Sequence, residues 1–263
     1  MASTVLEVTD LSFSYSSDKQ VLHDVTFAAA EGECIGLVGA NGAGKSTLLK
    51  ILVGLETGFG GDVTVCGISL AGDREDISEQ TKARRGNRVR TDRIRTVCEK
   101  IGYVFQDSDS QLFMTTVQED VAFGPRNMGL PEEEVKRRTG DALAAVGIGH
   151  LAASSVFKLS GGEKKLASIA TILAMSPEIL LMDEPSASLD PRNRRNLIHV
   201  LCGLPYTKLI ACHDLDFVLD TCSRCILLAD GGIAADGPAE EILSNKELLE
   251  RCGLELPLSR SRL

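Results

Sequence analysis

A glycine-rich segment at residues 39–46, GANGAGKS, fits the phosphate-binding pattern G-x-x-x-x-G-K-[ST] without a mismatch. Glycines let backbone N–H groups turn inward around an anion, and a following helix adds its positive N-terminal end. We expect Lys45 to bridge the β- and γ-phosphates of ATP, Ser46 to ligate Mg²⁺ and Thr47 to add a phosphate contact. The alternative is a glycine-rich turn that merely precedes a helix. The predicted nucleotide-binding residues of the loop are Gly39, Ala40, Asn41, Gly42, Ala43, Gly44, Lys45, Ser46 and Thr47.

Two neighbouring acids, Asp183 and Glu184, follow an apolar run at residues 179–182. Ligands gather at the carboxyl ends of parallel strands, so both side chains should face the same site. Asp183 can hold Mg²⁺, directly or through water. Glu184 can act as the general base that polarises an attacking water. Alone, the two acids could equally cap a helix or a turn; beside a phosphate-binding loop, they predict nucleotide hydrolysis.

The elements around these motifs alternate between strand and helix patterns. The order strand, glycine loop, helix over residues 34–52 is the context that a phosphate-binding loop needs. Further helices are expected within 117–150 and at 159–175, so we predict an α/β fold with a mainly parallel sheet. Strands are expected at residues 5–13, 21–27, 34–38, 101–105, 179–182, 209–212 and 225–229.

Residues 71–95 break this pattern, because they hold few large apolar side chains. Seven Lys or Arg residues lie between Thr81 and Arg95 in a chain that is otherwise acidic. A charge run of this kind indicates a solvated insertion. The alternative is a segment that contacts anionic lipid headgroups or an acidic loop of a membrane partner.

Composition narrows the class of protein. Hydrophobic residues make up 43% of the 263 residues, the formal net charge is -9 and the pI is about 5.1. An acidic chain repels phosphate backbones, so we expect no nucleic-acid partner. No segment approaches the roughly 18–20 apolar residues of a membrane helix, and the N-terminus has no signal-peptide pattern. We therefore expect a cytosolic protein that another subunit would hold at any membrane.

Eight cysteines raise the question of a metal site. Cys222 and Cys225 form a CxxC pair, but zinc needs about four ligands and no second pair follows. We expect free thiols, most of them within apolar runs.

The sequence LSGGE at residues 159–163 resembles the LSGGQ signature of ATP-binding cassette (ABC) ATPases. Ser160 and Glu163 also have the spacing of a capping box, so a plain helix start is the alternative. The order of motifs resembles the family too: phosphate loop, Gln, LSGG, paired acids, His, between Tyr15 and about Gly237. The resemblance implies a P-loop NTPase (RecA-like) core with a parallel sheet, an antiparallel β-subdomain and an inserted helical subdomain.

The resemblance also implies the organisation of the chain and its assembly. The nucleotide-binding core would comprise residues 1–107 and 158–245, the helical signature subdomain 108–157, the basic insertion 71–95 and the C-terminal tail 246–263. Two cassettes, identical or close paralogues, would pair head to tail with two ATP molecules between them. The N–H groups of Ser160, Gly161 and Gly162 would then contact the ATP held by the opposite phosphate loop.

Further residues correspond to family positions. Tyr15 corresponds to the aromatic residue that stacks on adenine, although it could be a plain strand-surface tyrosine. Gln106 corresponds to the glutamine that senses Mg²⁺ and water and joins the subdomains. Asp190, in the sequence Ser-Leu-Asp, would contact the opposite cassette, and His213 would touch the γ-phosphate. The sequence departs from the family at one point: Lys164 and Lys165 stand where the family often has an arginine. A lysine can pair with an acid but lacks the bidentate fork of the guanidinium.

Two strings, at residues 104–113 and 119–130, resemble the ATPases of energy-coupling factor (ECF) transporters, which import vitamins or Co²⁺/Ni²⁺. The string HDLDFVLD at 213–220 is most similar to the cobalt/nickel subgroup. The resemblance implies an ATPase on the cytoplasmic face of the membrane, bound to integral membrane subunits, with a cargo that never touches this chain. Six apolar residues could line the docking groove or fill the helical subdomain's own core: Leu112, Phe113, Met114, Val117, Val121 and Phe123.

Three other functions of such a cassette predict features that this sequence does not show. A soluble ABC ATPase of DNA repair or chromosome structure would carry long coiled coils, and no sustained heptads occur here. A translation-factor cassette would have two cassettes on one chain, and a regulatory cassette would lack Glu184 or His213. An ECF ATPase that energises vitamin uptake remains the nearest alternative.

Overall fold

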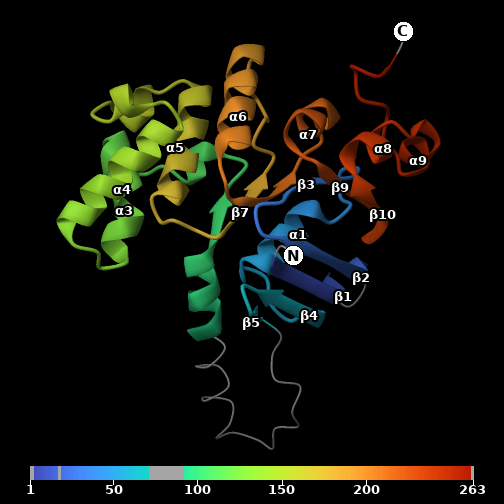
Figure 1. Cartoon of the computed structure of the whole chain (residues 1–263). Coiled ribbons are helices and arrows are strands. Elements are labelled where there is room, and N and C mark those ends of the chain that lie inside the picture. Colours follow the sequence, from blue (N-terminus) through green and yellow to red (C-terminus); the bar gives the residue numbers. More distant parts are fainter. Residues whose placement is uncertain (1–2, 17–18, 71–91, 262–263) are drawn as a thin grey trace, which may run out of the picture.

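The computed structural model describes residues 3–16, 19–70 and 92–261. Among these residues, the larger sheet has the strand order β10-β9-β3-β8-β7-β6 (Figure 1). The neighbouring strands β9, β3, β8, β7 and β6 pair in parallel. The edge strand β10 runs antiparallel to β9. The predicted α/β class with a mainly parallel sheet is therefore confirmed. The bounds are β3 Cys34–Val38, β6 Ile101–Val104, β7 Ile179–Asp183, β8 Thr207–Ala211, β9 Arg224–Ala229 and β10 Gly232–Pro238.

A second, antiparallel sheet packs beside the first. Its described strands have the order β2-β1-β4-β5, and α1 (Lys45–Leu52) is packed into the core that this sheet shares with the parallel sheet. Long alternating patterns explain the hairpin of the first two strands, in which Leu6 and Val8 are buried and Glu7 is exposed. The bounds are β1 Thr4–Ser16, β2 Lys19–Ala30, β4 Gly60–Val65 and β5 Ile68–Ser69.

The parallel strands are buried on both faces, which is why they read as continuous apolar runs in the sequence. In β7, Ile179 and Leu181 belong to the core shared with α1 and the antiparallel sheet. Leu180 and Met182 belong to the core on the opposite face, where α5 to α8 pack. Alternate residues thus serve two cores, and the strand's carboxyl end is fixed from both sides.

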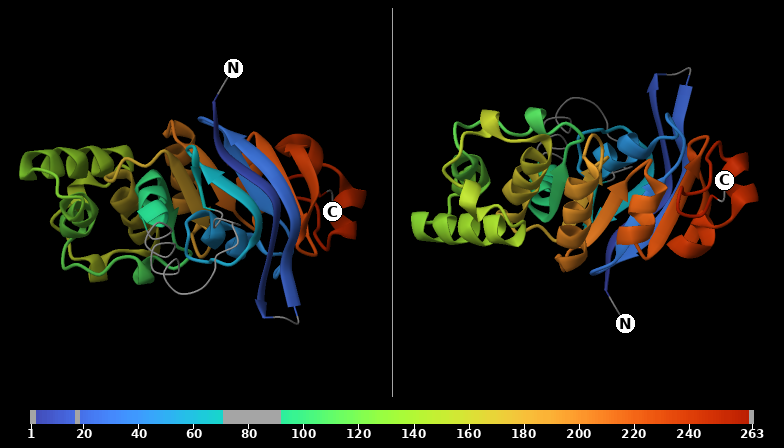
Figure 2. Two further views of the ribbon diagram at one scale, coloured as in Figure 1. Left: turned by 90° about the horizontal axis from the view of Figure 1, so that it is seen from below. Right: turned by 90° about the horizontal axis from the view of Figure 1, so that it is seen from above.

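A helical region occupies one end of the molecule, opposite α8 and α9 (Figure 2). It contains α3 (Val117–Asn127), α4 (Glu132–Ala145) and the signature helix α5 (Gly161–Leu173). Capping boxes start two of these helices, at Thr116 with Glu119 and at Ser160 with Glu163. Three short 3-10 turns, at Ser108–Ser110, Gly149–Leu151 and Val156–Lys158, belong to the same region.

The remaining helices follow the strands of the parallel sheet. α6 (Pro191–Gly203) starts at the N-cap Asp190, and α7 (Leu215–Thr221) starts at the N-cap Asp214. α8 (Ala239–Leu243) and α9 (Lys246–Arg251) lead into the C-terminal segment. Among the described residues, no helix is long and apolar enough to cross a membrane.

The basic insertion was predicted to extend to residue 95, and the structure differs there. Residues 92–100 are helical, with Val97 fully buried and Ile94 packed over Gly54. Two apolar side chains three residues apart are enough to fix one face of a short helix against the core. Residues 71–91, which hold most of the predicted insertion, lie outside the described part of the chain.

Of the six apolar residues predicted to line a docking groove or fill the core of the helical region, three are buried, two are exposed and Met114 is partly buried. Leu112, Val117 and Val121 are buried in the core. Phe113 and Phe123 are exposed, at 58% and 36%, and their rings meet edge to face with centroids 4.9 Å apart. The Asp120 carboxylate accepts hydrogen bonds from the N–H groups of residues 113 and 114, which holds this surface pair in place.

The cysteines are not all core residues. Cys98 and Cys202 are exposed, whereas Cys212, Cys222 and Cys225 are buried. The sulfur of Cys222 lies 3.5 Å from that of Cys34 in β3, so its neighbour is a distant cysteine and not its CxxC partner. Within residues 3–16, 19–70 and 92–261, no group of three or more His, Cys, Asp or Glu side chains could hold a metal ion.

Candidate active site

A cleft of about 530 Å³ lies at the carboxyl ends of β3, β7 and β8. It collects residues that are up to about 190 positions apart, because parallel strands deliver their following loops to one edge of the sheet. The lining residues are Val21, Asn41, Gly42, Ala43, Gly44, Lys45, Ser46, Thr47, Gln106, Glu184 and His213.

The phosphate loop forms the floor of this cleft and needs glycine at Gly44. That residue has a φ of 100°, and a Cβ there would lie 2.5 Å from the Leu22 side chain and 3.1 Å from the Val21 carbonyl oxygen. The Lys45 ammonium donates to the carbonyl oxygens of Gly39 and Ala40, at 2.7 and 3.2 Å. This side chain is therefore folded over the loop itself, 7% exposed, at the point where a phosphate group would be bound.

Asp183 at the end of β7 meets the loop from the other side. Ser46 donates its hydroxyl to one carboxylate oxygen at 3.0 Å, and Tyr103 donates to the other at 3.2 Å. Tyr103 belongs to β6 and was missed in the sequence, where it reads as one residue of a buried strand. Burial and the neighbouring Asp183 charge raise the pKa of the Tyr103 hydroxyl. It therefore stays protonated and can only donate to the carboxylate.

Glu184 and His213 form a contact across the cleft wall. His213 approaches one Glu184 oxygen, Oε2, both with its ring Nδ1 at 2.6 Å and with its backbone N–H at 3.2 Å. The Glu184 side chain is 11% exposed, while the His213 ring is 61% exposed. Glu184 has a φ of 47°, in the left-handed region. The loops after β7 and β8 thus bring together the two residues that the sequence assigned to water activation and γ-phosphate contact.

Tyr15 stands at the rim of the same cleft. Its ring is 57% exposed, and its hydroxyl lies 3.3 Å from the Thr47 hydroxyl. Phe13 meets the ring edge to face, with centroids 4.9 Å apart. Phe13 thus packs against a tyrosine whose ring is largely exposed and available to a planar ligand.

The signature residues lie elsewhere. Gly161 lines a separate cleft of about 330 Å³ with Gln106, Ser188 and Leu189. Ser160 caps α5 and its own N–H donates to the Glu163 carboxylate at 2.8 Å, so that donor already has an acceptor. Asp190 caps α6 beside this cleft. Within one cassette, Ser160, Gly161, Gly162 and Asp190 do not join the residues around the phosphate loop.

A buried lysine joins the signature helix to Gln106. Lys165 in α5 is 3% exposed, and its ammonium donates to the carbonyl oxygens of Phe105 and Gln106, at 3.0 and 2.8 Å. Burial lowers its pKa to about 8. The sequence pattern places Lys165 in the signature helix, but its acceptors are about 60 residues away, so they could not be identified from the sequence.

Comparisons with known proteins agree with this arrangement. A family model described as ABC transporter matches residues 22–187. A protein named as an ABC transporter ATP-binding protein of Geobacter sulfurreducens is 46% identical over 259 residues, which cover 98% of this chain and 96% of the relative. The energy-coupling factor transporter ATP-binding protein EcfA of Methanothermobacter thermautotrophicus is 38% identical over 256 residues, covering 96% and 77%.

Among solved structures, cbiO1 from Clostridium perfringens has a TM-score of 0.77 and 33% sequence identity, with 94% of each chain covered. Its title describes it as part of the ABC transporter complex cbiONQ. A bacterial Atm1-family ABC exporter, at 24% identity and a TM-score of 0.73, shares the fold and covers 97% of this chain. Motifs, fold, cleft and relatives converge: the chain belongs to the ABC transporter family as an ATP-binding subunit, and it is an ATPase.

Proposed function

We propose that this ATPase energises an ECF-type importer whose cargo, Co²⁺ or Ni²⁺, passes through separate membrane subunits. Two kinds of relative support this proposal: archaeal proteins named as energy-coupling factor transporter ATP-binding proteins, and the cbiO1 structure. The HDLDFVLD string at residues 213–220 favours the metal-ion type over the vitamin type.

Glu184 accepts a proton from the water that attacks the γ-phosphate. His213 fixes the carboxylate by two contacts to Oε2, and its exposed ring would contact the γ-phosphate. Gln106 lines the same cleft and orients the water. Lys45 exchanges its two carbonyl acceptors for phosphate oxygens when ATP binds.

The donor set beside the loop fits Mg²⁺, a hard cation that prefers oxygen ligands. The Ser46 hydroxyl and the Asp183 carboxylate lie 3.0 Å apart, and Gln106 lines the same cleft. Bound Mg²⁺ would neutralise charge on the β- and γ-phosphates. Ser46, Asp183 and Gln106 would hold it, with Tyr103 fixing the carboxylate from behind.

Two cassettes pair head to tail in this proposal. The separation of Ser160, Gly161 and Gly162 from the phosphate-loop cleft supports it, because a helix start that binds phosphate in the family lies outside the cassette's own site. Asp190 lies on the same side as the signature residues and would contact the opposite cassette.

The membrane subunit would dock on the helical region. Phe113 and Phe123 form an exposed aromatic pair there, on a surface fixed by the buried neighbours Leu112 and Val121. An exposed apolar pair of this kind suits an inserted apolar segment of a partner. The protein would thus sit peripherally on the cytoplasmic face of the membrane.

The convergence of Lys45, Glu184 and His213 on one cleft carries the hydrolytic part of the proposal, and the relatives named above carry the importer part. The decisive experiment is purification of the tagged chain from its native membranes, identification of the attached subunits by mass spectrometry and uptake assays in proteoliposomes. ATP-dependent uptake of Co²⁺ or Ni²⁺ is expected. Uptake of a vitamin would replace the cargo assignment, and a chain that purifies from its native membranes with no membrane subunit attached would refute the importer.

A further inference from the structure

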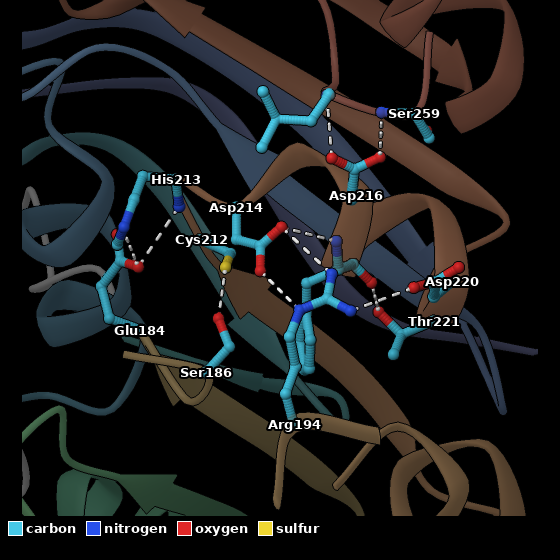
Figure 3. A network of polar contacts seen from close by, with 12 residues as sticks. Glu184, Ser186, Arg194, Cys212, His213, Asp214, Asp216, Asp220, Thr221 and Ser259 are labelled. Atoms are coloured by element: carbon cyan, nitrogen blue, oxygen red, sulfur yellow. Dashed lines mark hydrogen bonds and ion pairs between the residues drawn. The ribbon is translucent and has the colours of Figure 1, made fainter. Parts of the chain in front are cut away.

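The first turn of α6 carries a polar cluster that the ATPase motifs do not include (Figure 3). Arg194 grips the Asp214 carboxylate at both oxygens, through Nε at 2.7 Å and Nη2 at 3.1 Å. A third bond, at 3.3 Å, joins Nη1 to Asp220. The guanidinium also lies over the buried Phe217 ring, 5.5 Å from its centroid. The Arg194 side chain is 23% exposed, so this two-pronged contact is largely shielded from water.

Asp214 directly follows His213 in the chain, so its ion pair with Arg194 bears on the proposed catalytic residues. Its carboxylate also accepts the Phe217 N–H at 2.9 Å and so caps α7. The His213 backbone N–H in turn donates to Glu184. That N–H belongs to the peptide between Cys212 and His213, so the His213 backbone is anchored to Glu184 on one side and, at the next residue, to Asp214, which Arg194 holds in place.

The charge state of Asp214 suits this role. Burial opposes ionisation of the carboxyl, but hydrogen bonds from Arg194 and from the Phe217 N–H outweigh it, so the pKa of Asp214 lies below its ordinary value. The carboxylate remains charged at neutral pH and keeps both acceptors available.

The same helical turn touches the signature helix. Asp190 accepts the N–H groups of Arg192 and Asn193, and the Asn193 side-chain amide donates to it at 2.6 Å. Asn193 lies against Gly162 so closely that a Cβ on this glycine would be 2.3 Å from the Asn193 Cγ. One turn of helix therefore contacts the signature helix through Asn193 and the catalytic pair through Arg194 and Asp214.

We propose that Arg194 is a positioning residue for ATP hydrolysis, which holds the His213–Glu184 pair through Asp214 and links it to the start of the signature helix. It touches neither ATP nor the attacking water. Arg194 anchors the residue that follows His213, and Asn193 packs against Gly162 from the same turn of α6. The inference rests on the proposed hydrolytic roles of Glu184 and His213.

The test compares Arg194→Met, which keeps the length of the side chain, with Arg194→Lys, Arg195→Met and Asp220→Asn. For Arg194→Met we expect kcat to fall about tenfold or more while the Kd for ATP stays within twofold, since no group of the phosphate loop is touched. Arg194→Lys should recover part of kcat, because one of the two contacts can re-form. Arg195→Met, at the exposed neighbouring position, and Asp220→Asn, which weakens only the 3.3 Å contact, should keep kcat within twofold.

Three results would overturn the positioning role: an unchanged kcat in folded Arg194→Met, an equal loss in Arg195→Met, or a loss confined to ATP binding. If Arg194→Met fails to fold, Asp214→Asn takes its place, since the amide keeps an acceptor for the helix cap. A wild-type chain without ATPase activity would instead refute the proposed function, so the two failures differ.

The link to the signature helix is tested by a double-mutant cycle of Gly162→Ala and Arg194→Met. The added methyl group must displace Asn193, so the two effects on kcat should deviate from multiplicative by about threefold or more. Strictly multiplicative effects on kcat would show that the first turn of α6 does not couple Gly162 to Arg194.

Discussion

His213 contacts Glu184 through two different groups, its ring Nδ1 and its backbone N–H, and both reach the same carboxylate oxygen, Oε2. The ring contact can break when His213 turns toward a phosphate, whereas the backbone contact persists as long as the loop after β8 keeps its place. The backbone contact thus holds the Glu184 carboxylate even while the His213 ring changes partner. The two contacts to Oε2 also fix the direction of the second carboxylate oxygen, Oε1.

Replacing Glu184 by Gln should preserve ATP binding and lower turnover by about 100-fold or more, because an amide is a very weak base. An ATP-bound dimer should accumulate, visible by size-exclusion chromatography with ATP and Mg²⁺. Glu178→Gln is a suitable control, since Glu178 precedes the same strand but pairs with Lys100 outside the cleft. Normal turnover of Glu184→Gln would sink the assignment of the base.

Removing the Tyr103 hydroxyl should disturb the proposed Mg²⁺ site without touching the phosphate loop. The bond to the Asp183 carboxylate is charge-assisted, and contacts of this class contribute about 1.5–3 kcal/mol. Tyr103→Phe should therefore raise the Mg²⁺ concentration for half-maximal ATPase activity about tenfold. ATP binding measured without Mg²⁺ should not change. Equal Mg²⁺ dependence in both proteins would show that Ser46 alone fixes this carboxylate.

The head-to-tail arrangement predicts complementation between two inactive variants. Lys45→Ala should weaken nucleotide binding by about tenfold or more, since a charge-assisted phosphate contact is lost. Ser160→Arg should bind ATP normally yet fail to hydrolyse it, because bulk is placed where the γ-phosphate of the opposite cassette must lie. Mixed dimers of the two should regain one working site, measured as ATPase activity above either variant alone. Full activity of Ser160→Arg by itself would contradict the arrangement.

Lys165 should make stability depend on pH in the alkaline range. Its pKa is about 8 in the folded chain against an ordinary value of 10.5, so between these values the unfolded state binds more protons. The free energy of unfolding should then rise with pH, by up to about 3 kcal/mol relative to Lys165→Met. Urea unfolding of both proteins on either side of pH 8 measures this difference. A difference that does not vary with pH would mean that the ammonium titrates as it does in water.

Local patterns in the sequence predicted much of the fold. The strand at residues 34–38, the glycine loop and the following helix were all expected, because a short apolar run, a glycine pattern and a helix each depend on neighbours in sequence. The gathering of the loop with Glu184 and His213 also followed, since parallel strands share one carboxyl edge. The roles of these residues stay predictions.

The sequence did not predict the contacts of residues whose partners are distant in the chain. Tyr103 and Lys165 each look like part of a buried element, and only the three-dimensional structure brings Asp183 and the Gln106 carbonyl within reach. The helix at residues 92–100 was not predicted because its many charged residues resemble those of the preceding insertion. Only two apolar residues, Ile94 and Val97, attach it to the core. The contact between Cys222 and Cys34 could not be predicted for the same reason, since tertiary packing brings the two sulfurs together.

The left-handed backbone of Glu184, with a φ of 47°, carries a consequence for the evolution of this protein. A non-glycine residue held in this region stores about 1–3 kcal/mol, and asparagine enters it at lower cost than glutamate. The protein accepts this strain to place the carboxylate where two groups of His213 hold Oε2. A lineage released from the need to hydrolyse ATP would have no reason to keep a strained glutamate at this position.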